Sequence, residues 1–245
     1  MPLRTGAPAT HVGTFTGMIL ALALSVGLLA WSLIGNLLLG ETLYVTRNLV
    51  LGVLVVVLMR RAGGGWATLG VDPGQLRTGL RWGAVAALVV AVAVTVGVLL
   101  ADHVPGIDLL LSDERADLPS PLLAWHALWR IPVGTAAFEE VVFRGALLGL
   151  LLHQTTPTRA VLLSSVVFGL WHVAPTIVTL QINGVEIASA EGLGAIAGAV
   201  AVTTVAGIGF ALLRLGSGSL LSPVLAHWAT NSGGLLAAAL NQADT

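Results

Sequence analysis

Long apolar stretches constrain the fold of this chain more than any other feature of its sequence. Of its 245 residues 56% are hydrophobic and only 9% are charged, against about 25% charged in a soluble domain. A helix needs about 20 apolar residues to cross the hydrocarbon core of a bilayer. Seven stretches meet that need, namely residues 14–39, 43–59, 82–101, 133–153, 159–177, 194–213 and 218–239. The sequence therefore predicts an integral membrane protein.

The composition of these stretches favours helices over the strands of a membrane barrel. Barrel strands alternate apolar and polar residues over about ten positions, whereas these stretches are continuous runs of Leu, Val and Ala. Glycine and proline mark the joints between them, for example at Pro73-Gly74 and Pro105-Gly106. No internal repeat is visible. We expect an all-α, polytopic transmembrane bundle of about seven to eight helices, forming one domain over residues 1–245.

Residues 119–131 leave the number of spans open. Trp125 and Trp129 lie four residues apart, with His126 and Arg130 beside them. Tryptophan favours the interface between membrane and water. This segment could therefore be an interfacial turn, an extension of the helix at 133–153, or an eighth short span.

The distribution of arginine predicts the orientation in the membrane. The loop at 60–81 carries Arg60, Arg61, Arg77 and Arg81. If the helices alternate in direction, the turns at Arg159 and Arg214 lie on the same side. The loops at 102–118 and 178–193 are acidic instead. Because basic loops stay on the cytoplasmic side, we expect the amino terminus inside and, with seven spans, the carboxyl terminus outside. The expected location is the plasma membrane of a bacterial cell.

Three of the predicted helices carry polar side chains at a similar depth. Ionisable groups cost several kcal/mol in hydrocarbon, so within a span they are functional candidates by default. At about 1.5 Å per residue, Glu139, His172 and Asn231 each lie about 20 Å from the arginine-bearing ends of their helices. The full set is Glu139, Glu140, Arg144, Phe168, His172, His227 and Asn231. A single shared site is therefore expected.

Spacing along each helix suggests how these residues divide their roles. Residues four apart share a helix face, whereas adjacent residues diverge by about 100°. Glu140 and Arg144 can therefore pair and neutralise each other, which leaves Glu139 available. His227 and Asn231 can face one cavity. Phe168 lies one turn before His172 and could form a wall of that cavity.

These side chains suit hydrolysis by an activated water. Glu139, with His172, could hold the water and act as a general base. The N–H donors of His227 and Asn231 could stabilise a tetrahedral oxyanion. The chain has no cysteine and no serine in a nucleophile-elbow motif, so a water nucleophile is favoured over a covalent intermediate.

No cofactor is required by this pattern, and the default expectation is a site without metal. Glutamate and histidine also suit zinc, in which case the candidate ligands are Glu139, His172 and His227. The near-zero net charge and the scattered arginines give no case for nucleic-acid binding.

Three motifs occur in order along the chain: Glu139-Glu140-x-x-x-Arg144, Phe168-x-x-x-His172 and His227-x-x-x-Asn231. Together they resemble the CAAX protease and bacteriocin-processing family of intramembrane endopeptidases, which includes the type II CAAX prenyl proteases. The resemblance covers residues 139–231 and implies cleavage of a membrane-associated or lipidated peptide. It also implies that Glu139 and His172 activate water, that His227 and Asn231 form the oxyanion site, and that Glu140 and Arg144 support them.

The partners implied are a peptide or protein substrate, prenylated or not, and the lipid bilayer. Eukaryotic and archaeal members of this family are pictured with a site that faces the cytosol. The arginine distribution places the site of this chain in the outer half of the bilayer instead. The side from which a substrate would enter therefore stays open, as does the oligomeric state.

Two other functions remain as alternatives. The polar cluster could bind a peptide without cleaving it, in an immunity or scaffold protein. It could also serve as the relay of a proton-coupled transporter. The transporter is less favoured because no matched pair of Gly/Pro-interrupted spans occurs in two halves of the chain.

Overall fold

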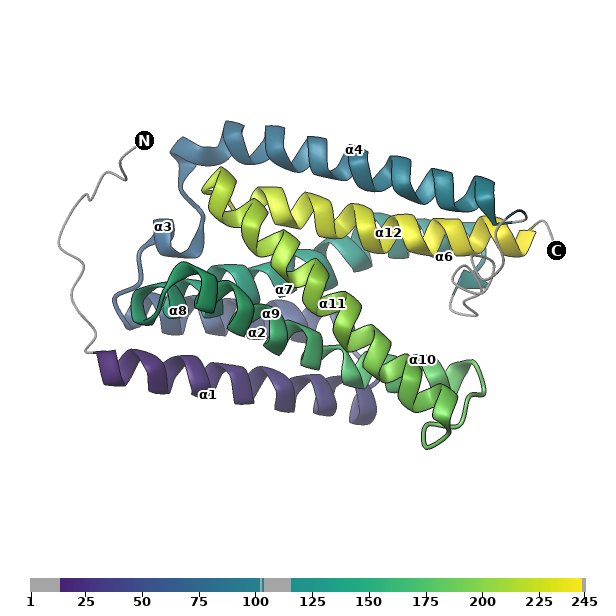
Figure 1. Ribbon diagram of the computed structural model, residues 1–245, viewed down its shortest axis with the longest axis horizontal. Coiled ribbons are helices and arrows are strands. Elements are labelled where there is room, and N and C mark those ends of the chain that lie inside the picture. The colour runs from purple at the N-terminus through teal and green to yellow at the C-terminus, as the bar shows by residue number, and fades with distance from the viewer. Residues whose placement is uncertain (1–13, 102, 104–115, 244–245) are drawn as a thin grey trace.

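The protein is all-α over the residues that its computed structural model describes, which are 14–101, 103 and 116–243. Figure 1 shows a bundle of long helices, with α1 along one flank and α4 along the opposite flank. Four helical segments are long and apolar enough to cross a membrane, namely Gly17–Leu38, Trp66–Leu100, Pro157–Ile182 and Ala190–Ser217. The predictions of an all-helical fold and of an integral membrane protein are thus confirmed.

The first half of the chain forms three long helices. Helix α1 (Thr14–Leu33) continues through one wide π-type turn, η1 (Ile34–Leu38), and α2 spans Tyr44–Arg61. The short helix α3 (Trp66–Leu69) and the 3₁₀ turn η2 (Pro73–Gln75) lead into α4 (Leu76–Leu100). These helices correspond to the first three predicted spans.

The second half carries all three motifs. One continuous helix, called here the 120–154 helix, consists of α6 (Ser120–Trp125), η4 (His126–Ala137), α7 (Phe138–Glu140), η5 (Val141–Leu147) and α8 (Leu148–Gln154). It is followed by α9 (Pro157–Trp171), α10 (Val173–Ile182), α11 (Ala190–Ser217) and α12 (Leu221–Ala243). Each remaining predicted span overlaps one of these helical runs.

Two details differ from the predicted boundaries. Residues 120–131 extend the helix of Glu139, so of the three alternatives for this segment the extension is the one observed. The predicted helix at 159–177 is interrupted, because α9 ends at Trp171 and α10 begins at Val173. The interruption places His172 at a helix junction rather than within a regular span.

The 120–154 helix has wide, π-type turns over much of its length. Such turns are often found at functional sites. Pro132 lies inside the first wide segment and has no N–H to donate. The carbonyl of Ala127, five residues before Pro132, instead accepts hydrogen bonds from Trp228 Nε1 (2.8 Å) and Ser232 Oγ (2.9 Å) of α12. The wide turns therefore create an attachment point for α12.

Small residues allow α4 to pack closely against α12, and Figure 1 shows the two helices side by side. A Cβ atom at Gly83 would lie only 2.7 Å from Leu225 Cδ1, and one at Gly79 would overlap Ser219 Oγ. Close backbone approach through small residues is the usual way in which helices associate in lipid. Helix α12 is thus packed against α4 as well as against the 120–154 helix.

The most deeply buried side chains lie in the middle of the 120–154 helix. Val142, Phe143, Ala146, Leu147 and Leu148 have no exposed surface. By contrast, α4 exposes large apolar side chains such as Leu88 and Val89, as expected of a helix that faces lipid. The first motif is therefore carried by the central helix of the bundle.

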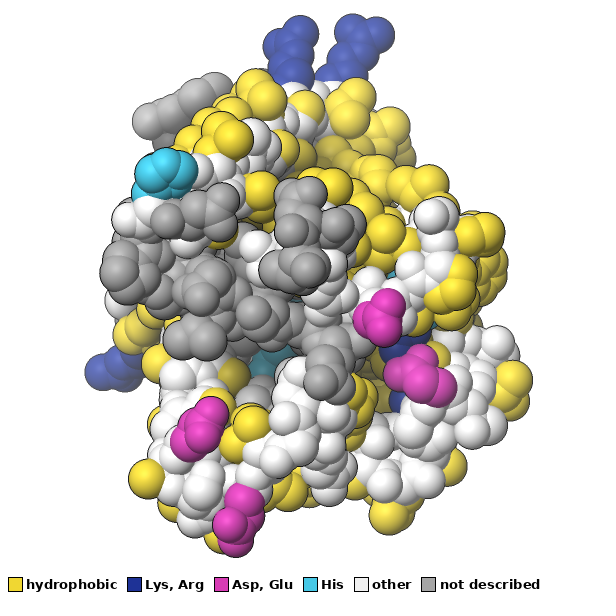
Figure 2. Space-filling view, turned by 90° about the vertical axis from the view of Figure 1, so that its right-hand side faces the viewer, with side chains coloured by type: hydrophobic (Ala, Val, Ile, Leu, Met, Phe, Trp, Pro, Cys, Tyr) yellow, Lys and Arg dark blue, Asp and Glu magenta, His cyan; other side chains and the backbone are white. Residues whose placement is uncertain are grey.

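The two ends of the bundle differ in charge. Figure 2 looks onto the end where α6 begins and where α4, α10 and α12 end, and acidic side chains stand out on this face. The arginines of the 60–81 segment lie at the other end, where α2 ends and α4 begins. The charge difference agrees with the loop composition, while the orientation relative to the cytoplasm stays a prediction.

Candidate active site

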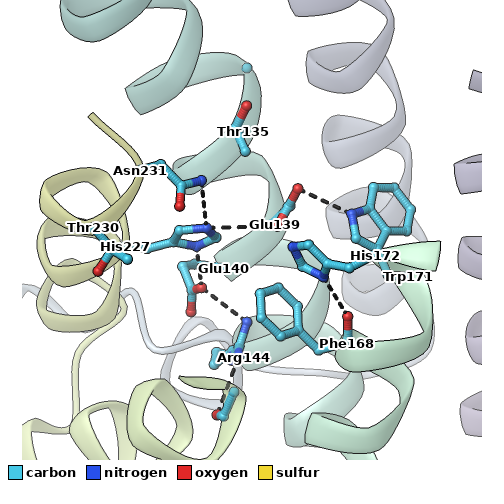
Figure 3. A network of polar contacts seen from close by, with 12 residues as sticks. Thr135, Glu139, Glu140, Arg144, Phe168, Trp171, His172, His227, Thr230 and Asn231 are labelled. Atoms are coloured by element: carbon cyan, nitrogen blue, oxygen red, sulfur yellow. Dashed lines mark hydrogen bonds and ion pairs between the residues drawn. The ribbon is translucent and has the colours of Figure 1, made fainter. Parts of the chain in front are cut away.

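The polar residues of the three motifs meet inside the bundle, as Figure 3 shows. The 120–154 helix contributes Glu139, Glu140 and Arg144, the junction of α9 and α10 contributes His172, and α12 contributes His227 and Asn231. Glu140, Arg144 and His227 are at most 2% exposed, and Glu139 is 4% exposed. Groups this deeply buried need partners, and the partners of each one define what it can do.

Arg144 is fully engaged by its surroundings. Its Nη1 donates to Glu140 Oε1 at 3.0 Å, and its Nη2 donates to the carbonyl of Gly207 on α11 at 3.2 Å. The guanidinium also lies 4.0 Å from the centre of the Phe168 ring, where a cation is attracted by the aromatic face. The Glu140–Arg144 pair expected from the four-residue spacing is therefore present, and both of its side chains are buried.

His227 links the two glutamates. Its Nδ1 lies 2.8 Å from Glu140 Oε1, and its Nε2 lies 3.8 Å from Glu139 Oε2. Asn231 Nδ2 lies 3.2 Å from the same Nε2. The ring of Phe210 on α11 stacks against the imidazole at 4.9 Å and 18°. The imidazole is thus held on one edge by a carboxylate, on the other by an amide, and on one face by an aromatic ring.

The hydrogen bonds of His227 determine where its proton lies. The carboxylate of Glu140 only accepts, so Nδ1 carries a hydrogen. In the neutral ring Nε2 is then an acceptor and takes the N–H of Asn231. In the charged ring Nε2 also carries a hydrogen, which points into the site. Only the charged form of His227 can donate to an oxyanion.

His172 is held by the end of its own helix. Because α9 ends here, the backbone N–H of His172 bonds to the carbonyl of Gly169 at 3.0 Å. The side chain takes the freed carbonyl of Phe168, with Nδ1 at 2.8 Å from that oxygen. A carbonyl only accepts, so the hydrogen of the neutral ring lies on Nδ1 and Nε2 keeps its lone pair. The ring of Phe168 packs edge-on against His172 at 4.6 Å.

Glu139 is oriented differently from its neighbour Glu140. Its Oε1 accepts a hydrogen bond from Trp171 Nε1 at 3.1 Å. Its Oε2 is buried and has no hydrogen-bond partner within the described part of the chain. One carboxylate oxygen is therefore fixed by Trp171, while the other lies 3.8 Å from His227 Nε2. Glu140 Oε2 is likewise buried without a partner among these residues.

Sequence reasoning missed four residues that support this site. Trp171 precedes His172 directly, and its position in the second motif was the available signal. Thr135, one turn before Glu139, shares a hydrogen bond of 2.9 Å with the hydroxyl of Tyr44. Asn48 donates to the carbonyl of Gly134 at 3.0 Å. Nothing in the spacing of α2 indicated that Tyr44 and Asn48 would face the helix of Glu139.

The zinc alternative finds no support in the geometry. Among the residues that the structure describes, no three His, Asp or Glu side chains are grouped as ligands of one metal ion.

The segment that carries this site is similar to a known family. Residues 121–233 match the family model described as type II CAAX prenyl endopeptidase Rce1-like. Residues 121–233 belong to this family. The Rce1-like domain begins at the start of the 120–154 helix, ends in α12 and contains all three motifs, which confirms the family resemblance of the sequence. No curated protein and no solved structure matched the chain. Helices α1, α2 and α4 lie outside the matched Rce1-like segment.

Proposed function

We propose that this protein is an intramembrane endopeptidase that hydrolyses a peptide bond of a membrane-associated or lipidated peptide. The observation that carries the proposal is the buried carboxylate oxygen of Glu139, Oε2, which lacks a donor from the described residues. An unsatisfied buried acceptor costs about 1–3 kcal/mol. Glu140 Oε2 lacks such a donor as well, but Glu140 is engaged by Arg144 and His227 through its Oε1, whereas the free oxygen of Glu139 lies 3.8 Å from His227 Nε2. A water held there by Glu139 and by the lone pair of His172 Nε2 is the proposed nucleophile.

In the proposed reaction, Glu139 removes a proton from the water as its oxygen attacks the scissile carbonyl. The resulting oxyanion accepts hydrogen bonds from Asn231 Nδ2 and from the Nε2–H of charged His227, each worth about 3 kcal/mol. Glu139 then passes its proton to the leaving amide nitrogen, and the C–N bond breaks. Glu139 thus acts as base and then as acid, so atoms and charges balance over the cycle.

Glu140 and Arg144 have a supporting part in this proposal. Glu140 Oε1 lies 2.8 Å from His227 Nδ1, so its carboxylate stabilises the imidazolium that the oxyanion needs, as in hydrolytic triads. Arg144 balances the charge of Glu140. With Glu139 and Glu140 ionised and Arg144 and His227 charged, the buried cluster carries no net charge.

The proposed substrate is a peptide within or close to the bilayer, prenylated or otherwise lipidated, and the proposed location is the plasma membrane of a bacterium. Two rivals remain for the function. In a non-catalytic peptide-binding, immunity or scaffold protein, the cluster would hold a peptide intact. In a proton-coupled transporter, flux across liposomes would depend on Glu139. The hydrolase is preferred because Asn231 and His227 place N–H groups next to the Glu139 oxygen that is proposed to hold the water.

The decisive experiment identifies a substrate and then tests the base. The peptides of membranes that contain the wild type are compared with those of membranes that contain Glu139→Gln. With the identified peptide, Glu139→Gln and His172→Ala are each expected to lower kcat by at least about 100-fold, because general-base catalysis contributes about 10²–10⁴-fold. Glu186→Gln, in the exposed α10–α11 loop, is the control and keeps wild-type turnover. Unchanged turnover in Glu139→Gln would exclude the proposed mechanism.

A further inference from the structure

Trp171 makes a direct contact with the proposed base. The indole is 4% exposed, and its Nε1 donates to Glu139 Oε1 at 3.1 Å. In Figure 3 the indole approaches Glu139 from the side opposite His227. Trp171 is thus the partner of the carboxylate oxygen that does not face the site.

This hydrogen bond restricts how the carboxylate can turn. The last torsion of a glutamate is broad and has no strong preferred angle, so an unheld carboxylate would sample many orientations. With Oε1 bonded to the indole, Oε2 is turned towards His227, whose Nε2 lies 3.8 Å away. Without the indole, Glu139 would have no hydrogen-bond donor from the described residues at either oxygen.

The indole is itself held in place from several directions. Ser32 Oγ on α1 donates to the carbonyl of Trp171 at 2.6 Å. The ring packs edge-on against Phe143 at 5.7 Å and against Phe138 at 5.9 Å, tilted by 52°. Because the backbone and the ring are both fixed, the N–H of Trp171 has a defined direction, as a positioning group requires.

The junction between α9 and α10 orients both Trp171 and His172. Where α9 ends, the side chain of His172 takes the carbonyl of Phe168, and the preceding residue extends its indole to Glu139. One turn of backbone therefore sets the direction of both proposed water-activating groups.

We propose that Trp171 is a positioning residue for Glu139. The indole holds one carboxylate oxygen of Glu139 so that the other oxygen can take the proton of the water. The role rests on the proposed function of Glu139 as the base. It predicts an effect on the chemical step with little effect on substrate binding.

The first test compares Trp171→Phe with the wild type on the identified peptide. Phenylalanine keeps an aromatic ring in the core and removes the N–H together with part of the indole, so the double variant below separates the loss of the hydrogen bond from the loss of packing. Because misplacement of a catalytic group by about 1 Å can cost 100-fold, kcat is expected to fall about 10- to 100-fold while KM stays within about twofold. Trp125→Phe, an exposed indole at the start of the 120–154 helix, is the control and keeps the wild-type kcat.

A double variant separates positioning from general structural damage. If Trp171 acts through Glu139, adding Trp171→Phe to Glu139→Gln causes no further loss of the residual rate, since residues that act as a unit are not additive. A structural role would multiply the two losses. A kcat for Trp171→Phe within twofold of the wild type, in an active enzyme, would overturn the proposal and leave the proposed function standing.

The contact can also be measured without a substrate. The chain has seven tryptophans, so the indole N–H region of an NMR spectrum is sparse, and the Trp171 signal is the one missing from Trp171→Phe. It is expected to move in Glu139→Gln, whereas the signal of Trp228, which donates to a backbone carbonyl, stays. An unmoved Trp171 signal would reject the contact. A moved signal in a protein that cleaves no peptide would retain the contact but overturn both the proposed function and the positioning role.

Discussion

Replacing Arg144 with methionine is expected to destabilise the protein far more than replacing Arg130, although both arginines pair with a glutamate. In the Arg144–Glu140 pair the side chains are 1% and 0% exposed, whereas in the Arg130–Glu41 pair they are 19% and 76% exposed. Removing one partner of a buried pair costs about 3–5 kcal/mol, because a charge stays buried without compensation. Exposed pairs contribute about 0–1 kcal/mol.

Arg130 has one additional contact that enters this comparison. Its guanidinium lies 4.1 Å from the centre of the Tyr44 ring, which adds about 0.5–1 kcal/mol at a partly exposed site. Arg130→Met is therefore expected to cost up to about 2 kcal/mol, and Arg144→Met about 3–5 kcal/mol. Tryptophan fluorescence during unfolding in mixed micelles can measure both, because the chain has seven tryptophans.

A double variant tests the reasoning behind this difference. Glu140→Gln removes the buried carboxylate that Arg144→Met leaves without its guanidinium partner, and its amide oxygen can still accept from His227 Nδ1. The double variant is therefore expected to be more stable than Arg144→Met alone. Equal costs for Arg144→Met and Arg130→Met, or no recovery in the double variant, would show that the buried pair does not carry the stability assigned to it.

Three further outcomes are expected. Gly70→Ala should destabilise the fold more than Gly184→Ala in the same unfolding assay. Both glycines have positive φ (77° and 67°), but a Cβ at Gly70 would overlap Arg214, whereas one at Gly184 meets nothing within 4 Å. Equal losses of stability would indicate backbone strain alone, about 1–2 kcal/mol. In whole cells an impermeant maleimide should label Glu186→Cys but label Gln75→Cys only after permeabilisation, and the reverse pattern would invert the orientation. Purified protein should keep its activity in a chelator, whereas one zinc per chain, lost together with activity, would establish a metal site.

Four of the seven predicted spans coincide with helices that are long and apolar enough to cross a membrane. They were predictable from sequence because lipid imposes a length and a composition on any helix that crosses it. The pairing of Glu140 with Arg144 was predictable as well, since four-residue spacing alone places both on one face. The separation of Glu139 from Glu140 followed from the 100° between adjacent residues. All of these depend on short-range geometry within one helix.

Other features depend on how separate helices meet, and single-helix spacing does not contain that information. The predicted span began at residue 133 and left residues 119–131 open, whereas wide turns carry the helix through Pro132. The role of Trp171 depends on where α9 ends, and that of Asn48 on the rotation of α2. The position of the ring hydrogen on His227 depends on its hydrogen bond with Glu140, which lies 87 residues away in the sequence.

The carbonyl of Ala127, inside the 120–154 helix, helps to set the axial register of α12. Lipid tails surround a helix uniformly along its length, so apolar contact alone does little to stop two helices from sliding past each other. Trp228 and Ser232 converge on this one oxygen and act as a stop at a defined height. Since His227 and Asn231 each directly precede one of these residues, a slip of one turn would displace both by about 5.4 Å from Glu139. One carbonyl oxygen thereby couples the depth of α12 to the depth of the glutamates.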